Sequence, residues 1–151
     1  MRHADPRIDR IVTLFETLTA ADVARLPEVY TPDAKFKDPF NEVRGVAQVQ
    51  RVFAHMFVAL DEPRFVVRDI VVQGDQCFLT WDFVFRFKRL ERELQTVRGA
   101  SHLKLAGDGR IALHRDYWDA AEELYEKLPW VGGLMRWLKR RANNVHPIFR
   151  N

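Results

Sequence analysis

Apolar residues recur at helical spacing in three segments of the first part of the chain. The first segment predicts a helix over 8–18. The second predicts a short helix with Asp22 as its N-cap, which ends before Thr31. The third begins after Gly45, ends near Pro63 and predicts a helix with a wide buried face. The first and third helices are each expected to bury one face.

The rest of the chain is rich in β-branched and aromatic residues, which favour strands. Four long strands are expected, over 64–72, 76–88, 94–105 and 111–118. Gly74-Asp75 and the segment 107–109 tolerate positive φ and predict hairpin turns, and the polar segment 88–93 predicts a third turn. A brief strand is expected over 34–37. Helices before strands predict an α+β domain with a mainly antiparallel, meandering sheet.

The C-terminal part of the chain predicts an appended segment. Residues 1–120 carry the patterns of one domain. Residues 121–142 predict a helical extension, interrupted by proline and glycine between 129 and 133, and residues 143–151 show no period and predict a tail.

Composition narrows the class of protein. The chain has 47% apolar and 30% charged residues and a formal net charge of +3, which is typical of a globular protein and lacks the dense basic stripe of a nucleic-acid-binding one. No apolar run is long enough to span a bilayer, and the N-terminus does not resemble a secretory signal, so we expect a cytoplasmic protein. Cys77 is the sole cysteine, and its apolar neighbours favour a buried structural residue over a reactive thiol.

Several short motifs together resemble one known superfamily. The segment 30–39 reads YTPDAKFKDP, and it is followed by Gly45, by Gly99, by the segment 108–111 and by the segment 116–119. In this order they resemble the nuclear-transport-factor-2-like superfamily, which includes SnoaL-like and ketosteroid-isomerase-like domains. Each motif alone is weak, so the resemblance depends on their joint order over residues 8–120.

The resemblance implies a cone-shaped α+β fold, in which N-terminal helices pack on a strongly curved sheet and enclose a pocket. Members of the superfamily include isomerases, cyclases, dehydratases and epoxide hydrolases, together with noncatalytic binding proteins and adaptors. Many pair through the outer face of the sheet, so a homodimer is expected. An apolar small molecule is the expected ligand, but the fold alone does not decide whether the protein is an enzyme.

Asp38 matches the proton-abstracting carboxylate of the ketosteroid isomerases. A carboxylate in an apolar cavity has its charged form disfavoured, which makes it a stronger base. The alternative interpretation is that Asp38 organises the turn before Pro39, as aspartate often does.

The residues expected to stabilise an oxyanion differ from those of the isomerases. By the same resemblance, their positions fall on Leu14 and Ser101, neither of which is an equivalent donor. Phe53 stands where a supporting tyrosine is expected, although Tyr30 matches a tyrosine found in some members. Steroid isomerisation is therefore disfavoured, and Tyr30, Phe53 and Ser101 are expected to shape the pocket.

The last strand offers a second set of candidate groups. Strand alternation places His114, Asp116 and Trp118 on one face, which the resemblance directs into the pocket. His114 and Asp116 are candidate acid and base, and Trp118 is a candidate pocket residue. The alternative is a structural pair between Asp116 and Arg115 or Arg98.

Which face of the strand 77–87 turns inward is open at this point. The hydrophobic pattern favours the face that carries Cys77, Leu79 and Trp81. The spacing of the family motif favours the opposite face, with Thr80 and Asp82, and a one-residue difference in a loop would reverse the choice.

No metal or cofactor is expected. The histidines lack metal-ligand spacing, and no phosphate-binding loop or dinucleotide fingerprint is present. Two functions remain open: a cofactor-independent isomerase, cyclase, dehydratase or hydrolase with an aspartate base, and a noncatalytic protein that binds a lipid-like ligand or serves as a dimeric adaptor.

The C-terminal segment combines aromatic and basic residues. Trp130 and Trp137 lie near the cations Arg136, Lys139 and Arg140 in a segment that is amphipathic if helical. Tryptophan and basic residues together are typical of a helix that binds a membrane surface. The alternative is that this helix packs on the domain with its cations in water.

Overall fold

A computed structural model describes residues 3–88, 93–123, 133 and 140. The chain divides into two compact units, residues 1–118 and residues 119–151. The first unit contains, in chain order, α1 (Pro6–Thr17), the 3-10 helix η1 (Ala21–Glu28), β1 (Tyr30–Lys37), β2 (Glu42–Arg44), α2 (Val46–Ala59), β3 (Leu60–Gln73), β4 (Gln76–Phe87), β5 (Gln95–Leu105) and β6 (Ile111–Tyr117). Within the second unit, the structure describes α3 (Ala120–Glu123), whose first turn is capped by Asp119.

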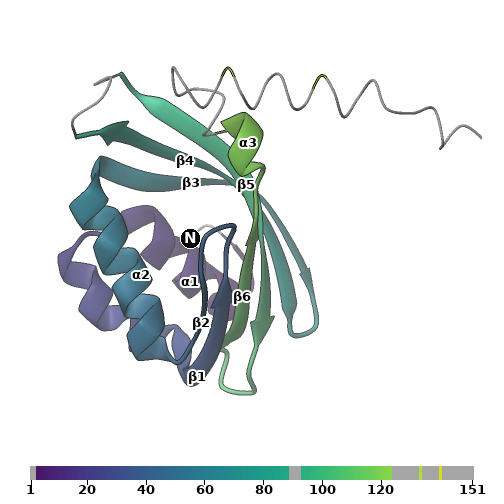
Figure 1. Cartoon of the computed structure of the whole chain (residues 1–151). Helices are drawn as coiled ribbons and strands as arrows, with labels where there is room; N and C mark the ends of the chain where they lie inside the picture. The colour runs from purple at the N-terminus through teal and green to yellow at the C-terminus, as the bar shows by residue number, and fades with distance from the viewer. Residues whose placement is uncertain (1–2, 89–92, 124–132, 134–139, 141–151) are drawn as a thin grey trace, which may run out of the picture. The chain divides into compact units, whose positions relative to one another are not determined.

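The first unit is an α+β fold, as predicted. Its six strands form one mixed, open sheet in the order β2-β1-β6-β5-β4-β3. The sheet is curved, and α1 and α2 pack on its concave side (Figure 1). The core lies between these layers, where residues such as Ile8, Ile11 and Leu103 are completely buried. Burial of this apolar surface is the main force that holds the helices on the sheet.

The expectation of a simple antiparallel meander is correct only for β3 to β6. There the two predicted glycine turns are present, with positive φ at Gly74 (61°) and Gly109 (83°), whereas most of the predicted turn at 88–93 lies outside the described residues. The strand β1 pairs with the last strand, β6, in parallel, and β2 pairs with β1 to form the edge of the sheet. Such long-range parallel pairing has no local sequence signal, and β2 is only three residues long.

Two prolines that lie close to the expected ends of helices fall within strands. Pro32 falls in β1, where the pairing with β6 is irregular between Tyr30 and Lys35. Pro63 falls in β3, where the pairing with β4 is irregular between Asp61 and Arg64. A proline lacks an N–H for the ladder, and such irregular positions are where a strand tolerates it.

Asp22 is not the N-cap of the second helix. The helix η1 follows Ala20, and the Asp22 carboxylate accepts hydrogen bonds from the backbone N (2.9 Å) and hydroxyl (2.7 Å) of Thr19. The aspartate therefore fixes the turn that precedes the helix. In contrast, α2 does begin after Gly45, whose φ of 97° suits glycine.

The inner face of β4 is the one that the hydrophobic pattern favoured. Cys77, Leu79 and Trp81 are buried, whereas Thr80 is exposed. The opposite choice, suggested by the spacing of the family motif, is wrong. Burial also raises the pKa of the Cys77 thiol to about 11, which keeps it protonated at neutral pH.

Much of the predicted C-terminal extension lies outside the described residues. This applies to four residues of the amphipathic segment, Trp130, Arg136, Trp137 and Lys139, and to the tail; Arg140 is described and exposed. Whether the amphipathic segment binds a membrane or packs on the domain therefore stays a prediction. No helix in the described part of the chain is long and apolar enough to cross a membrane.

A glycine on β5 makes room for the largest side chain of β4. Gly99 pairs with Trp81 across the two strands, and a Cβ added at Gly99 would lie 2.6 Å from Cζ2 of the indole. That distance is shorter than real Cβ contacts allow. The absence of a side chain at Gly99 therefore lets the indole ring lie over the β5 backbone.

Gly99→Ala should displace the Trp81 ring and lower the free energy of unfolding by about 1–3 kcal/mol, the usual cost of overpacking a core. The measurement is urea unfolding together with the indole N–H signal of Trp81 by NMR. Gly107→Ala is the matched control, because a Cβ there meets nothing within 4 Å. An unchanged Trp81 signal in Gly99→Ala would contradict this account of the packing.

Candidate active site

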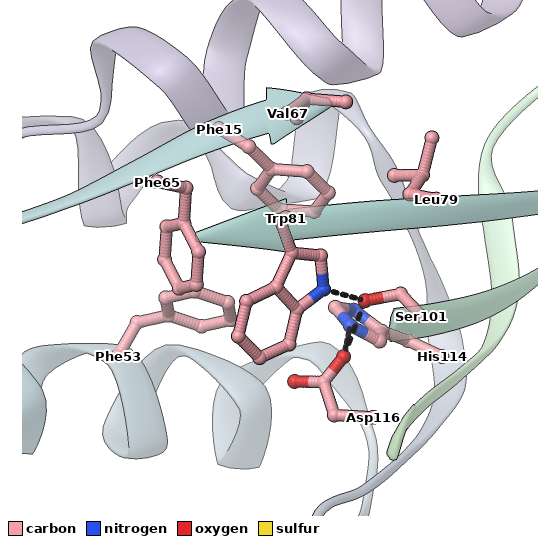
Figure 2. Close-up of a pocket in the computed structure, with 9 residues that line it drawn as sticks. All are labelled: Phe15, Phe53, Phe65, Val67, Leu79, Trp81, Ser101, His114 and Asp116. Atoms are coloured by element: carbon pink, nitrogen blue, oxygen red, sulfur yellow. Dashed lines mark hydrogen bonds and ion pairs between the residues drawn. The ribbon is translucent and has the colours of Figure 1, made fainter. Parts of the chain in front are cut away.

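A small cavity lies on the inner side of the sheet, between its strands and the two α-helices (Figure 2). Its volume is about 20 Å³, room for about one water molecule. The lining is mainly apolar, with a polar group on β5 and β6. The described lining residues are Phe15, Phe53, Phe65, Val67, Leu79, Trp81, Ser101, His114 and Asp116.

Strand register brings the polar residues together. Ser101 on β5 lies directly opposite Asp116 on β6 and opposite Leu79 on β4. His114 lies two residues before Asp116 on the same face of β6. Side chains directly opposite each other on one face of a sheet are close enough to interact. Two neighbouring strands, β5 and β6, therefore place a serine, a histidine and an aspartate beside the same cavity.

One oxygen of Asp116 accepts hydrogen bonds from both of these neighbours. The Ser101 hydroxyl donates to Oδ1 at 2.5 Å, and Nε2 of His114 lies 2.6 Å from the same atom. The indole Nε1 of Trp81 in turn donates to the Ser101 oxygen at 2.8 Å. Because the indole occupies one side of the serine oxygen as a donor, the serine proton is directed towards Asp116.

Tyr30 completes the network from the other side of His114. Its hydroxyl lies 2.6 Å from Nδ1 of His114, and its ring is fully buried. Burial, aided by the negative charge of Asp116, raises the pKa of Tyr30 well above its usual 10, so the hydroxyl keeps its proton. His114 Nδ1 is the one described acceptor for that proton. We therefore assign the neutral tautomer of His114, with its proton on Nε2 facing Asp116.

The network leaves the second oxygen of Asp116 unengaged. Within the described residues, Oδ2 has no hydrogen-bond partner, and Figure 2 shows it on the side away from His114 and Ser101. The Asp116 side chain is only 13% exposed. The site thus presents one carboxylate oxygen, held in a fixed position, inside an apolar cavity.

A protein-family model supports the fold described above. The model describes the SnoaL-like domain and matches residues 11–114. The chain belongs to the SnoaL-like family. The resemblance seen in the sequence motifs is thereby confirmed, and so is the α+β fold that it implied.

Solved structures show the same fold at low sequence identity. A hypothetical protein from Catenulispora acidiphila, in complex with trimethylamine, is 14% identical, with a TM-score of 0.69 over 81% of this chain and 92% of that one. A SnoaL-like polyketide cyclase candidate from Jannaschia is 18% identical (0.66; 81% and 94%). An epoxide hydrolase-like protein from M. tuberculosis is 17% identical (0.65; 91% and 96%). No functionally curated protein matches the chain.

Asp38 does not lie at the cavity of this SnoaL-like domain. It follows β1, and its Oδ1 accepts hydrogen bonds from the backbone N of Phe40 (2.8 Å) and of Asn41 (2.6 Å). The Asn41 amide also donates to Oδ2 at 3.0 Å. Both oxygens are therefore occupied in organising the turn, which was the alternative interpretation. A catalytic role for Asp38 stays a prediction without support from this geometry.

The other predicted pocket residues differ in position. Phe53 and Ser101 line the cavity, whereas Tyr30 is buried behind His114. Trp118 is not among the described lining residues, and its ring packs edge-on against Phe40 at 5.5 Å. Leu14, at the position of a missing oxyanion donor, is buried.

Asp116 pairs with His114 and Ser101 rather than with an arginine. Arg115, one of the alternative partners, lies over the ring of Tyr117 at 4.7 Å. Within the described residues, no group of three potential ligands could hold a metal ion.

Sequence reasoning did not identify the part played by Trp81. Its position on the inner face was favoured, but its hydrogen bond to Ser101 depends on the register between β4 and β5 and on the space over Gly99. The pairing of a large aromatic residue with a glycine was the available signal. It could be recognised only after the two strands had been aligned.

The raised pKa of Tyr30 makes stability fall at alkaline pH. In the unfolded chain the phenol ionises near pH 10, while in the folded protein it stays protonated. The unfolded state therefore releases a proton first, and the free energy of unfolding falls above about pH 10, by up to about 1.4 kcal/mol per pH unit from this residue.

Tyr30→Phe should make this alkaline decline shallower, because the variant has no phenol to ionise. Urea unfolding between pH 8 and 11 measures the slope. Tyr117→Phe, which removes an exposed hydroxyl, is the matched control. Equal slopes for wild type and Tyr30→Phe would show that the buried phenol does not resist ionisation.

Proposed function

We propose that this protein is a cofactor-independent enzyme in which Asp116 moves a proton on a small, largely apolar substrate. The free oxygen of Asp116 carries this proposal: Oδ2 has no described partner, while Oδ1 accepts two hydrogen bonds. A base needs one lone pair available to the substrate and a fixed orientation, and this arrangement supplies both.

The surrounding residues have positioning roles. Ser101 and His114 hold Oδ1, Trp81 holds Ser101, and Tyr30 sets the tautomer of His114. Oδ2 can take a proton from the substrate and return it to a different atom, which is the step that isomerases, cyclases and dehydratases share. In a hydrolase the same oxygen would take the proton of an attacking water. We therefore assign the base to Asp116 on β6, in place of Asp38.

Solved structures of the same fold support the proposal that the ligand is a small organic molecule. The Catenulispora protein is in complex with trimethylamine, and the others are named for polyketide cyclase and epoxide hydrolase activities. At 14–18% identity these proteins share the fold alone, so the reaction here is argued from Asp116 and its partners.

The size of the cavity favours a second candidate, a noncatalytic binding protein or dimeric adaptor. A volume of about 20 Å³ is far below that of an ordinary ligand pocket. The outer side of the sheet also carries Val71, Phe78 and Tyr117, each at least half exposed. These residues are where a homodimer interface would form. Homodimerisation and cytoplasmic location both stay predictions.

Asp116→Asn should strongly slow proton transfer to a general probe of carboxylate bases, 5-nitrobenzisoxazole. In this probe a base removes the ring C–H proton, the N–O bond breaks, and a coloured phenolate is released. We expect the wild-type rate to exceed that of Asp116→Asn by about 100-fold, a typical contribution of a positioned base. Absorbance spectroscopy measures the release.

Asp38→Asn is the matched control and should keep the wild-type rate, because Asp38 lies in the turn after β1. Near-ultraviolet circular dichroism checks that both variants keep the native fold. A rate that depends on Asp38 and not on Asp116 would reverse the assignment. Equal rates in all three proteins would favour the noncatalytic candidate.

A further inference from the structure

The charge inside the cavity comes from a single residue. With the tautomer assigned above, His114 is neutral, and Asp116 is the one charged side chain among the described lining residues. No lysine or arginine is among them. A carboxylate removed from water without a counter-ion is unfavourable, and a bound cation offsets that cost.

The hydrogen-bond donors of the cavity are already engaged. The Trp81 N–H is directed to Ser101, and the Ser101 hydroxyl and the His114 Nε2 proton are directed to Asp116. The described lining side chains therefore keep no donor for an anion or a carbonyl oxygen. The polar atom left for a ligand is Oδ2 of Asp116, which is an acceptor.

Aromatic rings form most of the remaining wall. Phe15 stacks on Phe53 at 6.3 Å, Phe65 meets Trp81 edge-on at 5.8 Å, and all four rings line the cavity. The face of an aromatic ring carries partial negative charge and attracts cations. The rings and the carboxylate thus favour the same sign of ligand charge.

We infer that the cavity binds a small tertiary ammonium ion. Its one N–H would donate to Oδ2 of Asp116, and its alkyl groups would lie against the rings. The inference rests on the proposed function in that it uses the same carboxylate oxygen. Because the cavity measures about 20 Å³, lining rings must turn aside on binding. Phe65 is partly exposed and can do so, and a ligand of few atoms requires the least movement.

Three probes of nearly equal shape test the role of charge at pH 7. They are protonated dimethylaminoethanol, the neutral 3-methyl-1-butanol and the anionic 3-methylbutanoate. Binding is followed by NMR titration of the Trp81 indole N–H signal. We expect the ammonium ion to bind about tenfold more tightly than the neutral alcohol, which is the scale of a desolvated cation–π contact with a charged acceptor, and the anion to bind least.

Variants separate the two sources of this preference. Asp116→Asn should remove it, and Phe53→Leu, which keeps an apolar side chain without a ring, should reduce it while the alcohol binds as before. Asp38→Asn should keep it. The inference is overturned if the alcohol binds as tightly as the ammonium ion, if the preference survives Asp116→Asn, or if no probe shifts the Trp81 signal.

Binding and turnover give independent results. If 5-nitrobenzisoxazole turnover depends on Asp116 but no probe preference exists, the proposed function stands and the inference about the cation is wrong. If the ammonium preference exists and turnover does not, the cavity is a cation-binding site, and the enzymatic proposal is wrong.

Discussion

The interior of this domain is organised around the partly buried carboxylate of Asp116. A charged group in an apolar setting must receive hydrogen bonds or be neutralised. Here His114 and Ser101 supply two hydrogen bonds, and both reach the same oxygen. Behind them, Tyr30 and Trp81 fix the direction of each donor. Oδ1 of Asp116 is therefore hydrogen-bonded, whereas Oδ2 faces the cavity.

Several features of the fold serve this arrangement. The parallel pairing of β1 with β6 brings the start of β1 close enough for Tyr30 to reach His114. The register of β4, β5 and β6 aligns Ser101 with Asp116, and the bare backbone at Gly99 lets Trp81 reach Ser101. The helices close the cavity with the rings of Phe15 and Phe53. A site built from neighbouring strands is held by the sheet itself.

Periodicity was enough to predict what is local in this chain. The helices that start near Pro6 and Val46, the four long strands and the inner face of β4 each follow from spacing and apolar pattern. His114 and Asp116 could be placed together because residues two apart on a strand share a face. The partnership of Tyr30 with His114 could not, because it depends on a pairing between distant segments. A motif alone likewise could not decide the role of Asp38. It suggested a catalytic base or a turn residue, and the hydrogen bonds from Asn41 to both carboxylate oxygens were recognised only in three dimensions.

The direction of the hydrogen bonds at His114 is the central claim, since it leaves Asp116 as the one charge among the described lining residues, with no described partner for Oδ2. Nitrogen-15 NMR of the histidine ring measures that direction at neutral pH. The structure predicts an unprotonated Nδ1 that accepts the Tyr30 proton and a protonated Nε2 facing Asp116. Protons on both nitrogens would place a positive charge beside Asp116, and a proton on Nδ1 alone would reverse the network; either result would contradict the account.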